Sequence, residues 1–159
     1  MFKYRILLSI IFILILFGCD QQADYYSEET FIVLTGESHT WELSGYEIKL
    51  TPKSFEIGNG TLTMKNTTDY LSDSFSYEVY ATINEEDQLI QQHHSSGQPV
   101  NLALKKIGSI TGEKLYLKNG KNIALRNVSA IYMLVEWKNQ DGQSSVERIE
   151  LYKRFDIKC

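Results

Sequence analysis

The feature that most limits the fold of this chain is a two-residue alternation of apolar and polar side chains. It begins near Thr30 and recurs, with interruptions, through the rest of the sequence. Adjacent side chains of a strand point to opposite faces, so such alternation is typical of antiparallel sheets with one buried face. The clearest runs are 46–51, 61–65, 75–83, 100–105, 131–137 and 149–151. Apolar residues at helical spacing are lacking, so we expect little helix.

Turn-forming residues separate these runs. Glycine and asparagine adopt a positive φ readily, and they recur between the apolar segments. The tight pairs are Asn59-Gly60, Asn119-Gly120 and Asp141-Gly142, and a looser connection is expected at Ser95-Ser96-Gly97 before Pro99. Residues 84–88 are predicted to form the turn that connects a strand at 75–83 to a strand at 89–94. Val146 and Ile149 break the alternation of the last run, which predicts a bulge there. The spacing favours an all-β, antiparallel β-sandwich of about eight strands, as a single domain over residues 30–159.

Two segments resemble known all-β families. The final hairpin, residues 130–152, resembles the closing strand pair of an immunoglobulin-like sandwich. Gly36-Glu37-Ser38 followed by Trp41 resembles the opening segment of small all-β secreted and lipoprotein domains of Gram-positive bacteria, whose roles are mostly undefined. These resemblances imply an immunoglobulin-like fold and carry no catalytic residues across.

The first 18 residues have the layout of a secretory signal. Lys3 and Arg5 precede an apolar run, residues 6–17. As a helix this run would be ~18 Å long, well short of the ~30 Å hydrocarbon core of a bilayer. A positively charged start followed by a short apolar run is typical of a signal peptide that directs export.

The segment Leu16-Phe17-Gly18-Cys19 resembles the lipobox of bacterial membrane lipoproteins. The resemblance implies that a diacylglyceryl group is attached to the sulfur of Cys19 and that residues 1–18 are removed. Residues 19–29 then tether the domain to the extracytoplasmic face of the cell membrane. Two or more acyl chains anchor a protein stably, whereas one chain does not. The alternative is a retained N-terminal anchor in which Cys19 has no role.

The charge balance excludes one class of partner. The chain has 16 basic and 20 acidic residues, a net charge of −4, and without residues 1–18 it has 14 basic residues and a charge of −6. Nucleic-acid binding needs clustered lysine and arginine, so we expect no nucleic-acid partner.

Two cysteines, Cys19 and Cys159, are too few for a disulfide scaffold or a cysteine-based zinc site. If Cys19 carries lipid, it has no free sulfur for a disulfide. Cys159 is then either an unpaired thiol, which we favour, or the link of a covalent dimer or of a bond to another thiol protein.

The sequence offers no complete catalytic motif. Residues 36–40 (GESHT) approach the Gly-x-Ser-x-Gly turn of serine hydrolases but lack the second glycine, so a turn role for Ser38 is favoured, with Trp41 entering the core. The carboxylate pairs lie in charged, exposed-looking contexts and lack the apolar pocket that a general acid needs. These pairs are Glu85/Glu86 and Glu147/Glu150. We therefore predict a protein that is not an enzyme and has no cofactor.

Two polar clusters contain side chains of the kinds that bind metal ions. His93 and His94 are adjacent, so in a strand they point to opposite faces and cannot share one ion. Asn66–Asp69 together with Asp73 is rich in oxygen but lacks the spacing of a calcium loop. We expect hydrated histidines and an ordinary connecting loop, and no metal site.

Ten tyrosines are the one compositional excess. The alternation places Tyr77 on the apolar face and Tyr80, Tyr116 and Tyr132 on the opposite face. Exposed aromatic rings on a sheet can stack on sugars or anchor a protein partner. The favoured interpretation is that they form cross-strand pairs that stabilise the sheet, or that a second sheet covers them.

Two functions remain open. The favoured one is a non-enzymatic binding or interaction module at the cell envelope, which contacts an envelope protein or a wall polymer. The alternative is a carrier of a small ligand or metal ion, whose site lies between the sheets or at their loops.

Overall fold

The computed structural model describes residues 29–113, 123–139 and 141–154. This part of the chain is all-β, with ten strands in two antiparallel sheets and one 3₁₀ turn, η1 (Leu125–Asn127). The strands are β1 (Thr30–Glu37), β2 (Trp41–Leu50), β3 (Ser54–Gly58), β4 (Thr61–Met64), β5 (Leu71–Ile83), β6 (Glu86–Asn101), β7 (Leu104–Lys106), β8 (Ile110–Glu113), β9 (Val128–Lys138) and β10 (Ser144–Lys153). The expected low helix content is confirmed for the described residues, none of which form a helix that could span a membrane.

The larger sheet has the order β7-β4-β2-β3-β8, with β1 on the other side of β2. Gly58 of β3 pairs with Glu47, and Thr61 of β4 pairs with Ser44, so β3 and β4 follow one another along one side of β2. On the far side of these two strands, β8 pairs with β3 and β7 pairs with β4, so β7 and β8 also lie end to end. The ten strands therefore make eight passes of the chain. The sequence-based number was lower because Asn59, at a φ of 62°, interrupts a strand here instead of reversing the chain.

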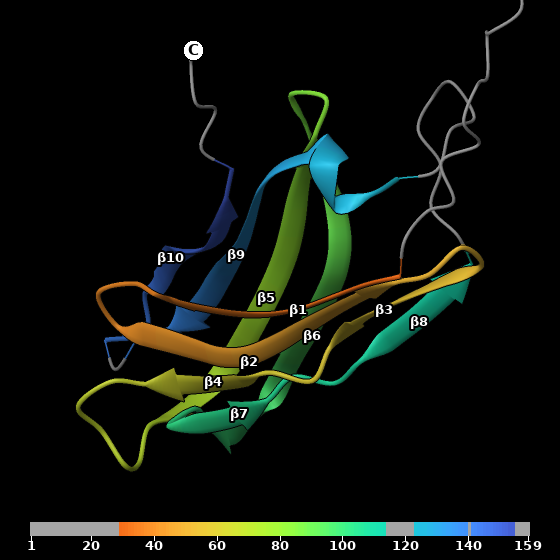
Figure 1. Cartoon of the computed structure of the whole chain (residues 1–159). Helices are drawn as coiled ribbons and strands as arrows, with labels where there is room; N and C mark the ends of the chain where they lie inside the picture. Colours follow the sequence, from red (N-terminus) through yellow and green to blue (C-terminus); the bar gives the residue numbers. More distant parts are fainter. Residues whose placement is uncertain (1–28, 114–122, 140, 155–159) are drawn as a thin grey trace, which may run out of the picture.

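The smaller sheet has the order β10-β9-β5-β6. Figure 1 shows its strands passing behind those of the larger sheet and crossing their direction. The alternation predicted for 75–83 is confirmed, since every second residue is buried between the sheets. These residues are Phe75, Tyr77, Val79, Ala81 and Ile83.

Aromatic rings from both sheets meet in the core. Trp41 of β2 is fully buried, and its ring centroid lies 5.4 Å from that of Trp137 in β9 and 6.1 Å from that of Phe75 in β5. Large buried rings supply much of the apolar area that holds two sheets together. The prediction that Trp41 enters the core is confirmed.

Two local predictions about the strands were wrong. Ser95, Ser96 and Gly97 do not form a connecting loop, because they lie within β6, where the pairing shifts between Ser72 and Ser74. The bulge expected beside Val146 lies instead between Glu150 and Tyr152. Val146 is simply an apolar residue on the outer face, 60% exposed.

Three other predictions concern residues outside the described part of the chain. They are the signal segment with Cys19, the hairpin at Asn119-Gly120, and Cys159.

Candidate functional site

A groove opens between the edges of the two sheets. One wall comes from β5 and β6 of the smaller sheet, and the other comes from β7, β8 and the residues between them in the larger sheet. Its volume is about 380 Å³, within the range of ligand pockets. Because its two walls carry aromatic side chains and lysines, we name it the aromatic–lysine groove. Its lining residues are Phe75, Tyr77, Gln91, Gln92, His93, Lys105, Lys106, Gly108, Ser109 and Ile110.

The wall from the smaller sheet is aromatic. Tyr77 and His93 are register partners on β5 and β6, and their rings stack with centroids 5.4 Å apart at 22°. The ring of Phe75 lies 6.3 Å from that of His93, at a tilt of 52°. Burial raises the pKa of the Tyr77 hydroxyl, so that this group stays neutral at physiological pH. His93 is exposed and presents its ring to the groove.

The floor of the groove is a buried amide that bridges the sheets. Gln91 accepts a hydrogen bond from the Tyr46 hydroxyl at 2.8 Å and donates from Nε2 to the carbonyl oxygen of Gly108 at 2.7 Å. Burial, together with the nearby Tyr77, raises the pKa of Tyr46. The phenol therefore remains a donor, and the bridge persists over the physiological pH range.

The opposite wall is basic. The Nζ of Lys106 donates to Thr61 Oγ1 at 2.8 Å, whereas Lys105 is half-buried and engages no partner among the described residues. None of the described residues that line the groove is an aspartate or a glutamate. The groove thus has a positive lining in a chain whose net charge is −4.

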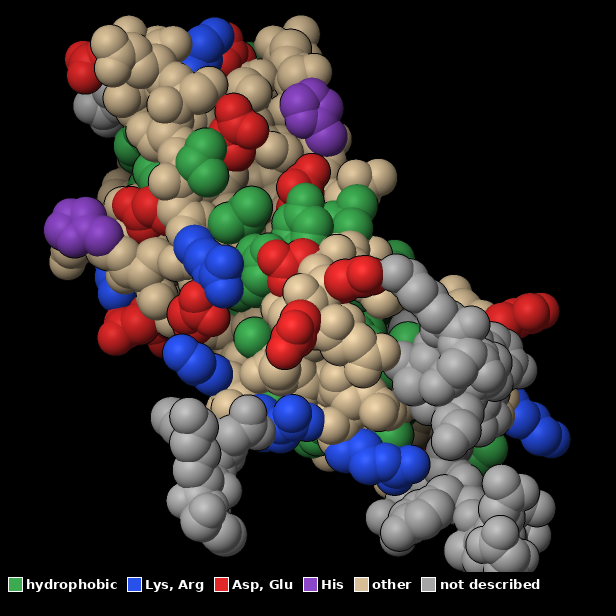
Figure 2. All heavy atoms as spheres, turned by 90° about the horizontal axis from the view of Figure 1, so that it is seen from above, with side chains coloured by type: hydrophobic (Ala, Val, Ile, Leu, Met, Phe, Trp, Pro, Cys, Tyr) green, Lys and Arg blue, Asp and Glu red, His purple; other side chains and the backbone are tan. Residues whose placement is uncertain are grey.

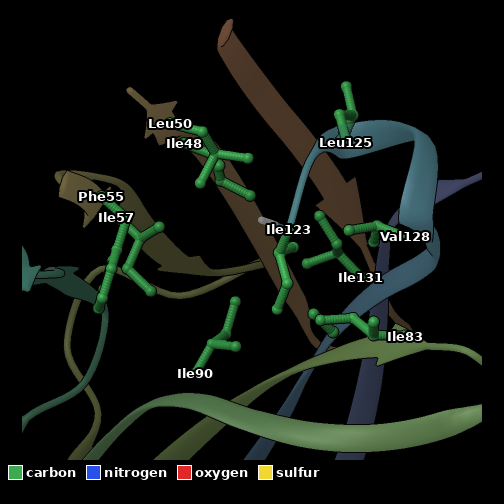
Figure 3. A pocket seen from close by; sticks show the side chains of 11 residues that line it. Ile48, Leu50, Phe55, Ile57, Ile83, Ile90, Ile123, Leu125, Val128 and Ile131 are labelled. Atoms are coloured by element: carbon green, nitrogen blue, oxygen red, sulfur yellow. The ribbon is translucent and has the colours of Figure 1, made fainter. Parts of the chain in front are cut away.

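A second hollow lies at the end of the sandwich near η1 and the β5–β6 turn. Eleven residues line it, all of them apolar, but its volume is only about 40 Å³. Figure 3 shows Ile57, Ile90 and Ile123 pointing toward a common space from β3, β6 and the segment before η1. Figure 2 looks onto this end of the molecule, where hydrophobic side chains gather near the middle with charged side chains around them. We name this hollow the apolar pocket.

A bulge shapes both hollows. The pairing of β5 with β6 shifts between Val79, which faces Gln91, and Tyr80, which faces Leu89. Ile90 is therefore the extra residue on β6, and it lines the apolar pocket while its neighbour Gln91 forms the floor of the groove. In a regular strand these two side chains would point to opposite faces.

The structure separates the two histidines as expected, since His93 lines the groove and His94 does not. The described residues contain no group of three His, Cys, Asp or Glu side chains able to hold a metal ion. In the oxygen-rich loop, Asp69 accepts a hydrogen bond from Asn101, and Asp73 pairs with Lys138. This segment connects β4 to β5 as an ordinary loop.

The turn role predicted for Ser38 is confirmed. Its backbone N–H donates to the carbonyl of Trp41, and its Oγ accepts from the Trp41 N–H at 3.1 Å. Glu147 differs from its expected exposed setting. Its carboxylate is half-buried and accepts hydrogen bonds from Ser38 Oγ, Thr40 N and Thr40 Oγ1 at 2.6 to 2.9 Å. Burial acts to raise the pKa of Glu147, but these hydrogen bonds outweigh it and lower the pKa.

The outer tyrosines of the smaller sheet pair with each other. Tyr80 and Tyr132 are register partners, and their rings stack with centroids 5.3 Å apart. The guanidinium of Arg148 lies over the Tyr132 ring at 3.5 Å. The favoured interpretation, a cross-strand pair, is thus confirmed for these two residues, whereas Tyr116 lies outside the described residues.

Sequence reasoning missed most of the groove. It singled out His93 and placed Tyr77 on the apolar face, but it did not identify Gln91, Lys105 or Lys106. The pairing of Tyr77 with His93 could not be read from the turn, because regular pairing from Ile83 and Glu86 puts Gln92 opposite Tyr77 and the bulge at Ile90 shifts the register by one residue. The place of β7 depends on its pairing with β4, which is distant in sequence.

The geometry of the groove suits binding. Among the described residues, no hydrogen bond links His93 to a hydroxyl or a carboxylate, as a nucleophile–base pair would require. What the groove offers is a flat aromatic face, an amide and the ammonium group of Lys105, because Lys106 follows Lys105 in β7 and directs its Nζ to Thr61 on the other face of the sheet. No protein-family model matches this chain, and no match was found among curated proteins or among solved structures.

Proposed function

We propose that this chain is a lipid-anchored binding protein of the cell envelope and that it is not an enzyme. The aromatic–lysine groove is its binding site, and the ligand is a segment of a wall polymer or of an envelope protein. The observation that carries the proposal is the groove itself, because it combines a volume of about 380 Å³ with stacked rings and polar groups. Ligand sites usually have these properties.

The anchor in this proposal is the lipid on Cys19. Its support is the order of Lys3 and Arg5, the apolar run 6–17 and the segment Leu16-Phe17-Gly18-Cys19. The tether of residues 19–29 would then hold the domain at the extracytoplasmic face of the cell membrane. Metabolic labelling with a palmitate analogue tests the anchor. We expect label in the unaltered chain and none after Cys19→Ala, and label that persists in this variant contradicts the proposal.

The binding function is tested by cross-linking in intact cells. A photoreactive amino acid replaces Ser109, which is exposed and lines the groove, or Glu42, which is exposed on the larger sheet. We expect a cross-linked species from position 109 and none from position 42. Equal yields from both positions, or no yield from either, contradict the assignment of the groove.

The second candidate function is a carrier of a small ligand. The apolar pocket favours it, since every lining residue is apolar and the pocket lies between the sheets. Its volume of about 40 Å³ makes it a narrower site than the groove. Native mass spectrometry of the purified lipoprotein distinguishes the two functions, because a carrier retains a small apolar molecule and the binding module does not. For a metal-ion carrier, the described residues supply no cluster of ligands.

We also propose that the domain is a variant of the immunoglobulin-like sandwich. The order β10-β9-β5-β6 supports this, since it parallels the G-F-C sheet of that fold extended by one strand. The larger sheet departs from the A-B-E-D order, because β3 and β4 occupy the place beside β2. An experimental structure in which β9 and β10 do not pair would contradict this kinship.

A further inference from the structure

The lining of the aromatic–lysine groove has a charge opposite to that of the chain. The chain carries 20 acidic and 16 basic residues. The groove brings together Lys105, Lys106 and His93, and none of its described lining residues is acidic. Local fields attract ligands of complementary sign even where the net charge repels them. The charge pattern therefore favours an anionic ligand in the groove.

The two lysines are not equivalent. Lys106 follows Lys105 in β7, and its Nζ donates to Thr61 at 2.8 Å on the outer face of the larger sheet, away from Lys105. Lys105 has no partner among the described residues, and its half-buried position restricts its side chain. An anionic oxygen in the groove would therefore meet Lys105 as a donor whose hydrogen-bonding capacity is unused.

The facing wall supplies a flat ring. His93 is exposed and lies over Tyr77, whereas Gln92, its neighbour in β6, pairs with Glu78 on the outer face of the sheet. Aromatic faces bind the C–H faces of sugar rings. The two walls together match a ligand that alternates charged groups with hydroxylated carbon units.

We propose that the groove binds an anionic polymer whose sugar or polyol units carry phosphate or carboxylate groups. This inference rests on the proposed binding function and names the ligand class for the same site. The polymer lies with an anionic group on Lys105 and with a carbon face on His93. An acidic peptide would satisfy Lys105, but its carboxylate side chains offer no unit for the aromatic wall.

Binding is measured with the full lipoprotein in nanodiscs of phosphatidylcholine. The probes are poly(glycerol phosphate), polygalacturonate, neutral dextran and poly-glutamate. We expect one or both of the first two polymers to bind, with the stronger of them identifying phosphate or carboxylate as the preferred group. Their apparent affinity should fall about tenfold between 50 and 300 mM NaCl, since exposed ion pairs are screened by salt.

Matched variants locate the site. Lys105→Gln with Lys106→Gln should lower the affinity for the polymer at least tenfold. Lys53→Gln with Lys153→Gln changes the net charge equally at exposed positions outside the groove and should change the affinity less than twofold. His93→Ala should lower the affinity about threefold or more, whereas His94→Ala, one position along β6, should not. Circular dichroism confirms that each variant is folded.

Three outcomes overturn the inference. They are dextran binding as tightly as the charged polymers, poly-glutamate binding more tightly than either polymer, and equal losses in the two lysine pairs. The first two leave the proposed function intact if position 109 still cross-links in cells. If no probe binds and position 109 yields no cross-link, the proposed function fails as well.

Discussion

Tyr46 of the larger sheet and Gln91 of the smaller sheet are joined by a buried hydrogen bond of 2.8 Å. The same glutamine donates to the carbonyl of Gly108, between β7 and β8, at 2.7 Å. One side chain thus holds together the two sheet edges that enclose the aromatic–lysine groove. Both the oxygen and the nitrogen of its amide are hydrogen-bonded, as the polar atoms of buried side chains usually are.

Gln91→Ala should destabilise the domain and open the groove. The substitution leaves the Tyr46 hydroxyl and the Gly108 carbonyl without a partner, at a cost of about 2–3 kcal/mol in the free energy of unfolding. Urea denaturation followed by tryptophan fluorescence measures this change. Gln92→Ala, at the exposed neighbouring position, is the control and should change the stability by less than about 0.5 kcal/mol. Equal effects of the two substitutions would refute the bridging role.

Glu147→Gln should remove part of the stability that depends on pH. The hydrogen bonds from Ser38 and Thr40 hold the pKa of Glu147 in the folded domain below 4.5, the ordinary value for glutamate, so they stabilise the fold above about pH 4.5. This contribution is lost as the pH falls through the lowered pKa. Thermal unfolding at pH 7 and pH 3 should differ less in the variant than in the unaltered protein.

Glu150→Gln is the matched control for this measurement. Glu150 lies on the same strand, and its carboxylate accepts from the exposed Arg148. We expect this variant to keep the acid dependence of the unaltered protein. The role of Glu147 is refuted if Glu147→Gln unfolds with the same dependence on pH as Glu150→Gln.

Trp41→Ala should be far more harmful than Trp41→Phe. Removal of the ring leaves a cavity between Phe75 and Trp137, at a cost of about 3–5 kcal/mol. Phenylalanine retains an aromatic contact and removes a buried indole N–H that has no hydrogen-bond partner among the described residues. We therefore expect Trp41→Phe to cost less than about 2 kcal/mol. Chemical denaturation of both variants checks the order, which a similar loss in each would contradict.

The sequence predicted the strands because their burial follows a local rule. Along β5 the apolar residues fall at every second position, and the structure buries each of them. The turn predicted at 84–88 lies at Asn84 and Glu85, which adopt positive φ values of 53° and 66°, whereas residues 86–88 already belong to β6. Such features depend on neighbours in the chain and on the contrast between apolar and polar side chains.

The groove could not be predicted, because it depends on contacts between distant segments. The bulge at Ile90 turns that side chain and Gln91 to the interior together, although their sequence alone suggests opposite faces. Lys105 belongs to an apparent alternation that begins at Val100, but that segment divides between β6 and β7. Leu104 is 59% exposed as a result, and Leu102 is buried.

If Cys19 carries lipid, as proposed, the protein should run as a monomer on a non-reducing gel of native membranes. Cys19 then has no free sulfur, and we expect Cys159 to remain an unpaired thiol that an alkylating reagent modifies. The alternative is a covalent dimer, which would give a band of twice the mass that disappears in Cys159→Ser. Such a band contradicts the monomer.

Occupancy of the groove in its native setting is measured most directly by lysine footprinting. Intact cells and the purified protein are treated with the same amine-acylating reagent, and modification of each lysine is determined by mass spectrometry. Lys105 lines the groove, whereas Lys53 and Lys153 lie outside it and serve as internal controls. A bound ligand predicts that Lys105 is protected at least severalfold in cells relative to the purified protein, with little change at the two controls. Equal reactivity of Lys105 in both samples would contradict the groove as a binding site.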